Sequence, residues 1–495
     1  MAALVPVASL ALGCAQDLPG TVPPETQLHF PVGLLKVSSG DTDFLLVGSS
    51  NFDQRFNSGR LFLFSVDALL ALVPSDETSV VFRNDFGDAI SDSVRVDSLS
   101  GELAVVELDP DGDGQTAPYV LSPSRGRNEL AIVRVDAAEG RLSCSAESPD
   151  ASDAARARQV GFDCTNSHRV RLQARDPFPV SVTQFGERKL ITIGSLGAET
   201  PFAGSVFTRA TFMSDDYIAG RVSGLLGPFE PEEDCNVNEF SLNTVRGISG
   251  LIPLPNAGDD IARVLALSFQ QSPQLSVIRH EVSQLESAND CANFDPATEE
   301  NGGEGLLVAP SLDLRLDTVL SVLETRGAAV TADGRRAFLS TRFIDSADTT
   351  NAAIVVLDLT VEPARIISVL EVGEELARPN LDEGRADGAK LLYVGDQRFD
   401  LVYVIDVTTD LPRIAARIES RGIRELNGRQ QQVRLLDQPS QMAFVQDGDR
   451  RVAFVSNFSN STLGIIDVTD ADPRRHRVIA RLGRDLDPQG DSEGQ

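Results

Sequence analysis

Five polar loops, each lying between two apolar runs, carry the side chains best suited to holding a ligand. Four of them contain an arginine and two contain an asparagine, namely Arg55, Arg125, Arg342, Arg398, Asn51 and Asn457. Guanidinium groups bind carboxylates and phosphates through forked hydrogen bonds, so the arginines would suit an anionic ligand if their loops meet. The alternative, which we favour, is that each arginine pairs with a local aspartate (Asp53, Asp345 or Asp400) and only orders its loop.

A second candidate site is an acidic turn. Asp109, Asp111 and Asp113 occupy alternate positions, as the first oxygen ligands of a calcium loop do. The twelfth position of such a loop is Val120 here, where an EF-hand has a bidentate Glu. The run is therefore not an EF-hand. Two interpretations stay open: a structural calcium ion, or an acidic solvated turn.

The chain contains no recognisable catalytic motif. His29, His168, His280 and His476 are scattered and form no metal-binding or haem-attachment pattern. A nucleophile elbow and a phosphate-binding glycine loop are also missing from the sequence. We therefore assign no catalytic residue, and no cofactor beyond the calcium candidate.

The cysteines suggest an oxidising compartment. Besides Cys14 there are four, Cys144, Cys164, Cys235 and Cys291, and an even number favours disulfides in an exported chain. The short C-x-x-C spacing of zinc sites is absent. Residues 144–164 and 235–291 each bracket polar, acidic sequence, and closing a loop of about 20 residues adds roughly 3 kcal/mol of stability in the chain-entropy model. Of the three pairings we prefer 144–164 with 235–291.

Composition limits the partners and the elements. The chain has 495 residues, is 41% hydrophobic and has a net charge of −29. Its hydrophobic content supports a large core, and its charge argues against nucleic acid and against adsorption to an anionic membrane. The 39 glycines and 26 prolines are spread throughout, which favours many short elements joined by turns.

A short unit recurs along the chain: an apolar strand, a glycine turn, a second apolar strand, a polar loop and a third strand. The turn glycines are Gly40, Gly112, Gly186, Gly258, Gly334, Gly388 and Gly448. The second strands are expected at Phe44–Val47, Pro118–Leu121, Leu190–Ile193, Ala262–Leu267, Ala337–Leu339, Leu391–Val394 and Val452–Val455. Asp-Gly between apolar runs is a strong hairpin signal. Seven such units predict an all-β, seven-bladed β-propeller of four-stranded blades, with six or eight blades as alternatives.

The repeat resembles that of YVTN or lactonase-like propeller proteins, in which an Asp-Gly turn is followed by an aromatic-Val strand and an Ile-Asp ending. The resemblance is clear over 326–470 and weak over 31–300. It implies a propeller over 31–484, followed by a polar tail over 485–495. An assembly of β-sandwiches is the alternative, but it would not produce regularly spaced copies of one turn.

The first 30 residues are typical of export. Residues 1–13 are apolar and too short for a membrane span, which needs about 20 residues, but they suit a signal peptide. The run ending Leu12-Gly13-Cys14 resembles a bacterial lipobox, which implies lipidation of Cys14, followed by a polar tether over 14–30. The resemblance to sorting signals favours the outer membrane. The alternative is a signal peptide without lipidation, which would release the protein into the periplasm.

These features predict an envelope-anchored lipoprotein that acts as a non-enzymatic binding or scaffolding module. Its partner would be an envelope protein, a peptide or a glycan. A lactonase-like or other hydrolase with a site at the mouth of the propeller channel is the alternative. Three or more carboxylates and a histidine converging on the channel would favour the enzyme. A mouth lined by paired arginines and hydroxyls would favour binding.

Overall fold

A computed structural model describes most of the chain. The described residues are 22–39, 42–73, 79–108, 116–126, 129–144, 169–171, 176–185, 188–196, 207–213, 239–241, 248–254, 261–268, 274–281, 306–308, 312–313, 321–344, 350–361, 364–426 and 429–484. Almost all the regular structure in these ranges is antiparallel β-sheet. None of the helices in them is long and apolar enough to cross a membrane.

The described strands form seven sheets of four or five strands, which we number in chain order. Sheet 1 contains β1 (Pro31–Ser39), β2 (Thr42–Ser49), β3 (Gly59–Ser65) and β5 (Ile90–Val96). Sheet 2 contains β6 (Ala104–Leu108), β7 (Ala117–Ser124), β8 (Glu129–Asp136), β9 (Arg141–Ser143) and β10 (Arg169–Arg171). Sheet 3 contains β11 (Pro177–Phe185), β12 (Arg188–Ser195), β13 (Phe207–Met213) and β14 (Glu239–Ser241). Sheet 4 contains β15 (Ile248–Leu254), β16 (Ile261–Ser268), β17 (Gln274–Glu281), β18 (Leu306–Val308) and β19 (Leu312–Asp313).

The last three sheets follow the same order. Sheet 5 contains β20 (Ser321–Val330), β21 (Arg336–Ile344), β22 (Thr350–Asp358) and β23 (Arg365–Glu371). Sheet 6 contains β24 (Leu376–Asp382), β25 (Leu391–Asp396), β26 (Leu401–Asp406) and β27 (Arg413–Ile418). Sheet 7 contains β30 (Pro439–Asp447), β31 (Arg450–Asn457), β32 (Thr462–Asp467) and β33 (Arg477–Leu482), with β4 (Val81–Arg83) at its edge. A separate hairpin, β28 (Arg421–Leu426) and β29 (Arg429–Arg434), lies between sheets 6 and 7.

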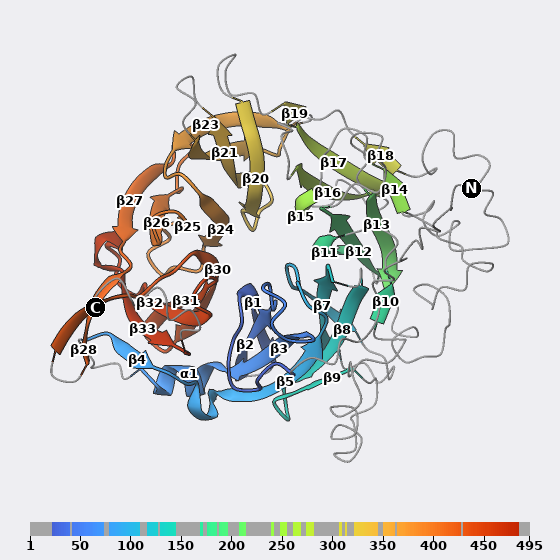
Figure 1. Cartoon of the computed structure of the whole chain (residues 1–495). Helices are drawn as coiled ribbons and strands as arrows, with labels where there is room; N and C mark the ends of the chain where they lie inside the picture. Colours follow the sequence, from blue (N-terminus) through green and yellow to red (C-terminus); the bar gives the residue numbers. More distant parts are fainter. Residues whose placement is uncertain are drawn as a thin grey trace, which may run out of the picture.

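The sheets are arranged radially around a central space, with the first strand of a sheet toward the centre (Figure 1). Contacts run between first strands of successive sheets, from β11 through β15, β20 and β24 to β30, and then from β30 to β1. Apart from β4, which pairs with sheet 7, each sheet is built from consecutive strands, which distinguishes this architecture from a β-sandwich. The propeller expected from the repeat is thus confirmed.

Turn chemistry and burial explain why the repeat folds this way. Gly334, Gly388 and Gly448 have φ of 65°, 73° and 54°, the left-handed region that glycine enters without steric cost. All seven apolar runs expected after the turns lie in the second strand of a sheet. In β2 and β31 these runs are buried on both faces, because a sheet of a propeller packs between two neighbours.

The ring closes between sheet 1 and sheet 7. A short segment from the connection between β3 and β5 forms β4, which lies parallel to β33 at the edge of sheet 7. The backbone N–H of Leu34 donates to Oε1 of Gln441 at 2.9 Å, across the junction of sheets 1 and 7. One hydrophobic cluster contains residues of both sheets, including Phe64, Phe86 and Phe454.

The described part of the expected tether packs against sheet 1. Leu28 is fully buried, and the backbone N–H of His29 donates to Oγ of Ser49 at 2.7 Å. Nη2 of Arg60 donates to the carbonyl of Pro23 at 3.0 Å. Leu28 also belongs to a hydrophobic cluster of the propeller. Residues 23–30 of the expected tether are therefore packed against the propeller. Residues 1–21, including Cys14, lie outside the described residues, as does the tail at 485–495.

Candidate functional site

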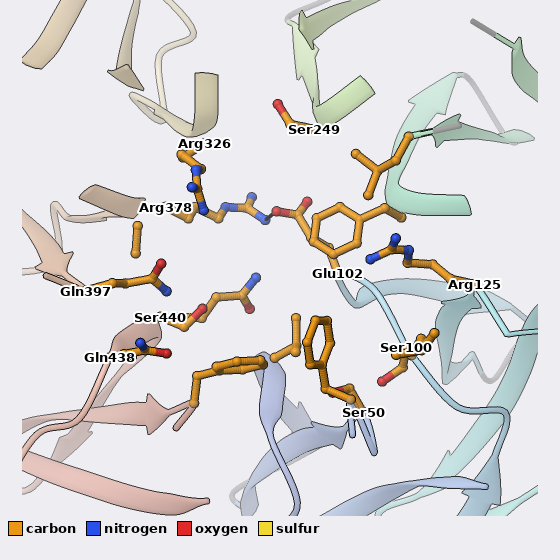
Figure 2. A pocket seen from close by; sticks show the side chains of 18 residues that line it. Ser50, Ser100, Glu102, Arg125, Ser249, Arg326, Arg378, Gln397, Gln438 and Ser440 are labelled. Atoms are coloured by element: carbon orange, nitrogen blue, oxygen red, sulfur yellow. Dashed lines mark ion pairs between the residues drawn. The ribbon is translucent and has the colours of Figure 1, made fainter. Parts of the chain in front are cut away.

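A cavity of about 360 Å³ lies at the centre of the ring (Figure 2). Residues from all seven sheets or their connections line it: Val32, Ser50, Phe52, Leu99, Ser100, Glu102, Arg125, Phe178, Leu196, Ser249, Arg326, Ala377, Arg378, Gln397, Gln438, Ser440, Gln441 and Phe458. Apart from the approach to β6 and Gln438, which directly precedes β30, they belong to first strands or follow the ends of second strands. The cavity therefore opens on the face that carries the loops between second and third strands.

β-Bulges place many of these side chains. Six of the first strands change register against the second strand near the start, and a bulge leaves its extra residues without a cross-strand partner. The skipped positions include lining residues from six sheets: Val32, Phe178, Ser249, Arg326, Ala377, Arg378, Ser440 and Gln441. The bulges of the innermost strands therefore surround the cavity and supply many of its lining side chains.

An ion pair crosses the cavity. Nη1 of Arg378, in β24 of sheet 6, lies 2.9 Å from Oε1 of Glu102, which precedes β6 of sheet 2. These two sheets lie on opposite sides of the ring (Figure 1), and Figure 2 shows the side chains meeting between them. Glu102 is 5% exposed, and this burial raises the pKa of its carboxyl group against the opposing effect of the Arg378 charge.

Two further arginines line the cavity. Arg326 in β20 donates through Nε to Glu324 at 2.6 Å and through Nη2 to Glu375 at 3.3 Å. Arg125, in the loop after β7, contacts Asp176 through Nε at 3.4 Å. Its guanidinium points toward the centre of the cavity from the side opposite Arg378 (Figure 2). The three arginines and Glu102 are the only charged residues in the described lining.

Aromatic rings form one wall. Phe52 and Phe458 follow the second strands of sheets 1 and 7, and their ring centroids are 5.5 Å apart. Phe30 packs on both, at 6.1 and 5.2 Å. Phe52 is 52% exposed, although phenylalanine is among the residue types most often buried in folded proteins. The wall therefore offers apolar surface next to the arginines.

Strained backbone and an unpaired hydroxyl accompany the cavity. Leu99 and Gln438 have φ of 60° and 49°, a conformation that costs a non-glycine residue about 1 kcal/mol. Such outliers cluster at functional sites when the surrounding structure enforces them. The Oγ of Ser100 is buried and has no hydrogen-bond partner within the described part of the chain. A ligand in the cavity could supply that partner.

Of the arginines predicted from the loops, Arg125 lines the cavity and three others do not. Arg55 pairs with the local Asp53 at 3.0 Å. Arg342 contacts Glu324 of the neighbouring strand β20 at 3.4 Å, and Arg398 contacts Glu374, between β23 and β24, at 3.8 Å. Asp400 contacts Arg434 at 3.3 Å, and Asp345 lies outside the described residues.

The two predicted asparagines hold their own loops. Nδ2 of Asn51 donates to the carbonyl of Phe56 at 2.8 Å, and Oδ1 accepts from the Phe56 N–H at 3.1 Å. Nδ2 of Asn457 donates to the carbonyl of Leu435 at 3.3 Å and to Oγ1 of Thr462 at 3.0 Å. Neither asparagine lines the cavity.

All but one of the remaining candidate residues lie outside the part of the chain that the structure describes. Asp109, Asp111, Asp113, Cys164, Cys235 and Cys291 lie outside the described residues, so the calcium site stays a prediction. Cys144 follows β9 and is 5% exposed. The pairing of the cysteines stays a prediction as well.

The sequence did not point to Arg326 and Arg378, which lie in first strands, or to Glu102, because only the loops between second and third strands were considered as a ligand site. A positional signal was present for part of the lining. Val32, Phe178, Arg326 and Ser440 each lie eight residues before a turn glycine, at Gly40, Gly186, Gly334 and Gly448. No comparable signal identifies Glu102, which lies in a connection between sheets.

Comparisons with known proteins give distant similarities only. Neither the family models nor the curated proteins include a match to this chain. A functionally unknown protein from Desulfotomaculum acetoxidans is 11% identical, with a TM-score of 0.45, 86% of this chain covered and 92% of the other. A putative 6-phosphogluconolactonase from Bacteroides fragilis is 11% identical, with a TM-score of 0.38 and coverage of 94% and 99%. The WD40 domain of Toxoplasma gondii coronin is 8% identical, with a TM-score of 0.37 and coverage of 94% and 90%. Similarities at this level carry no conclusion about a ligand or an activity.

Proposed function

We propose that this protein is a binding module that receives part of its partner in the central cavity. The observation that carries the proposal is the chemistry of the described lining, where the single carboxylate, Glu102, is already paired with Arg378. The other polar lining residues are serines, glutamines and two further arginines. Such groups hold a ligand through hydrogen bonds, but they are poor proton-transfer groups near neutral pH.

A lactonase-like hydrolase is the alternative function. It needs an activated nucleophile, which histidine, converging carboxylates or a metal ion usually supplies. The described lining contains neither a histidine nor a second carboxylate. The described residues also contain no group of three or more His, Cys, Asp or Glu side chains placed to hold a metal ion. These observations support binding over hydrolysis.

We also propose that the module is exported and anchored through Cys14, so that its partner is an envelope protein, peptide or glycan. The support for this part is the apolar run at 1–13 followed by the lipobox-like sequence. The even number of cysteines besides Cys14 is consistent with an oxidising compartment.

The experiment compares capture by the intact protein and by variants with a filled cavity. The full-length protein is cross-linked in the envelope, solubilised in detergent and purified. Gln438→Trp and Ser440→Trp each place an indole in the cavity from partly exposed positions, so that a folding defect in one leaves the other. Arg55→Gln is the matched control, on the same face but outside the lining. Thermal unfolding checks that each variant is folded.

We expect the wild type and Arg55→Gln to capture the same partner and both tryptophan variants to lose it. Equal capture by all four proteins would place the interaction elsewhere and overturn the proposal. A panel of lactones is assayed in parallel. Lactone hydrolysis that both tryptophan variants abolish would establish the enzyme alternative instead.

A further inference from the structure

The chemistry of the cavity narrows the class of ligand. We infer that the cavity receives the carboxyl-terminal end of a peptide whose last side chain is apolar, with the terminal carboxylate bound among Arg125, Arg326 and Arg378. This inference rests on the proposed binding function and names its ligand. It commits to a peptide; an acidic sugar is treated below as an outcome of the test.

The charge of the lining is the first argument. Three arginines and one glutamate line the cavity, in a chain whose net charge is −29. Arg326 is paired with Glu324 and Glu375, and Arg378 with Glu102, so Arg125 is the least engaged of the three. Arg125 contacts a described side chain only through Nε, and its partner Asp176 is itself 43% exposed. The outer nitrogens of Arg125 can therefore donate to a ligand. Guanidinium groups match the planar, two-oxygen geometry of a carboxylate.

Glu102 supplies the second argument, because it already places a carboxylate in this site. Its carboxylate reaches Arg378 across the ring at 2.9 Å and is almost completely buried there. The centre of the cavity thus accommodates a carboxylate against a guanidinium. A ligand carboxylate would approach the same guanidinium and compete with Glu102 for it.

The apolar wall is the third argument. Phe52, Phe178 and Phe458 line the cavity together with Leu99, Leu196, Val32 and Ala377. The exposed ring of Phe52 offers surface that an apolar side chain of the ligand would remove from water. A carboxylate next to an apolar side chain is what the last residue of such a peptide presents.

The polar lining suits a peptide backbone. Gln397, Gln438 and Gln441 carry amides that both donate and accept, as a peptide bond requires. The buried Oγ of Ser100 adds an unpaired group. At about 360 Å³ the cavity lies at the lower end of the roughly 300–1,000 Å³ range of ligand pockets, which fits a chain end and not a folded domain.

The test measures binding of one peptide in two forms to the full-length protein by calorimetry. The probe is acetyl-Gly-Ser-Gly-Ala-Phe, either with a free terminal carboxylate or as the terminal amide. We expect the acid to bind about tenfold or more tightly than the amide, which is the scale of one charge-assisted hydrogen bond. Equal binding of acid and amide would overturn the role of the carboxylate.

Variants assign the effect to residues. Arg378→Gln and Arg125→Gln should each reduce the preference for the acid severalfold while leaving amide binding little changed. Because Arg125 has one exposed partner, its variant stays informative if Arg378→Gln fails to fold. Arg398→Gln, a 70% exposed residue outside the lining, should behave as wild type. Glu102→Gln removes the competing carboxylate and should tighten acid binding only. Unchanged preference in both arginine variants would overturn the inference.

Other outcomes separate this inference from the proposed function. Binding of a uronic-acid oligosaccharide, with neither peptide form bound, would replace the peptide by a glycan and overturn the inference. If no probe binds but the tryptophan variants still lose the envelope partner, the inference fails and the binding function stands. If the tryptophan variants capture the partner as well as the wild type does, both the proposed binding function and this inference fail.

Discussion

Glu102 and Arg378 pair in unequal environments. Glu102 is buried, whereas the Arg378 side chain is 33% exposed, so the loss of hydration falls mainly on the carboxylate. Desolvation raises the pKa of Glu102, and the nearby guanidinium opposes that shift without cancelling it. A buried ion pair of this kind is weak evidence for stability. We therefore expect the pair to contribute little to the free energy of folding.

The first prediction concerns the pH dependence of this pair. Because the folded pKa of Glu102 lies above its unfolded value, folding is favoured by protonation, and this contribution is lost as pH rises through the folded pKa. Glu102→Gln should therefore unfold with nearly the wild-type free energy at acidic pH. With rising pH it should become progressively more stable relative to wild type. Denaturant titrations between pH 4 and 8 measure the difference, and a difference that is constant across that range would contradict the prediction.

The bulged first strands are the elements that form the site. Arg326 lies at a register shift of β20, directly before Gly327, whose φ is 140°. A Cβ at Gly327 would lie 2.8 Å from Cγ of Arg378. The absence of a side chain at Gly327 in sheet 5 therefore leaves room for the Arg378 side chain of sheet 6.

Gly327→Ala tests this dependence. The new methyl group should displace the Arg378 side chain, lower the unfolding free energy by about 2 kcal/mol and reduce the preference for the acid peptide. Gly388→Ala is the matched control, because it introduces an alanine at a φ of 73° with nothing within 4 Å of the new Cβ. It should cost about 1 kcal/mol from backbone strain and leave binding unchanged. An identical loss of peptide preference in both variants would argue against the contact with Arg378.

The strand β4 protects an edge at the closure of the ring. It pairs in parallel with the outermost strand of sheet 7, β33, and so covers backbone groups that an edge strand would expose. The Gly483 N–H, just after β33, donates to the carbonyl of Arg83 at 3.0 Å. Closure thus depends on a segment that belongs to the connection within sheet 1.

Arg83→Pro should weaken this closure. The Arg83 carbonyl accepts from the Gly483 N–H, so the Arg83 N–H lies on the same side of β4 and faces β33, and proline at this position removes a donor of the ladder. Amide hydrogen exchange over Arg477–Leu482 should become faster than in wild type. Arg83→Ala keeps the N–H while removing the exposed side chain, which separates backbone pairing from side-chain contacts. Equal exchange in the two variants would show that the Arg83 side chain, and not pairing of β4, protects β33.

At the scale of the whole molecule, the central cavity depends on closure of the ring, because residues from all seven sheets or their connections line it. The Glu102–Arg378 pair and the Leu34–Gln441 hydrogen bond each join residues far apart in sequence across or around the centre. Variants that open the ring should therefore lose the cavity together with stability. Residues 23–30 contribute to this closed unit, so an anchor at Cys14 would be connected to it through a short segment.

The proposed anchor has a direct test. Cys14→Ala removes the thiol that would carry the lipid, so the protein should move from the membrane fraction to the soluble fraction of the envelope. Fractionation with immunodetection measures the distribution, and thermal unfolding confirms that the propeller is intact. Membrane association that survives the substitution would exclude a lipid at Cys14.

The amino-acid sequence by itself determined the sheets and their order. Turn glycines such as Gly334 and the apolar runs that follow them act over a few residues, so the hairpins could be located directly. Repetition of one unit then indicated a propeller, since a single four-stranded sheet cannot bury both of its faces alone. Arg125 was identified in the same way, as a residue of a recurrent loop.

Only the tertiary structure decided which side chains meet. Arg378 and Glu102 approach because sheets 6 and 2 lie across the ring, and Arg326 faces the cavity because β20 has a bulge. Arg342, predicted from the same place in the repeat as Arg125, lies in β21 and contacts Glu324 outside the lining. Side-chain direction at a bulge depends on register with the neighbouring strand, and distances across the channel depend on ring closure. Both are long-range properties, which local sequence patterns do not encode.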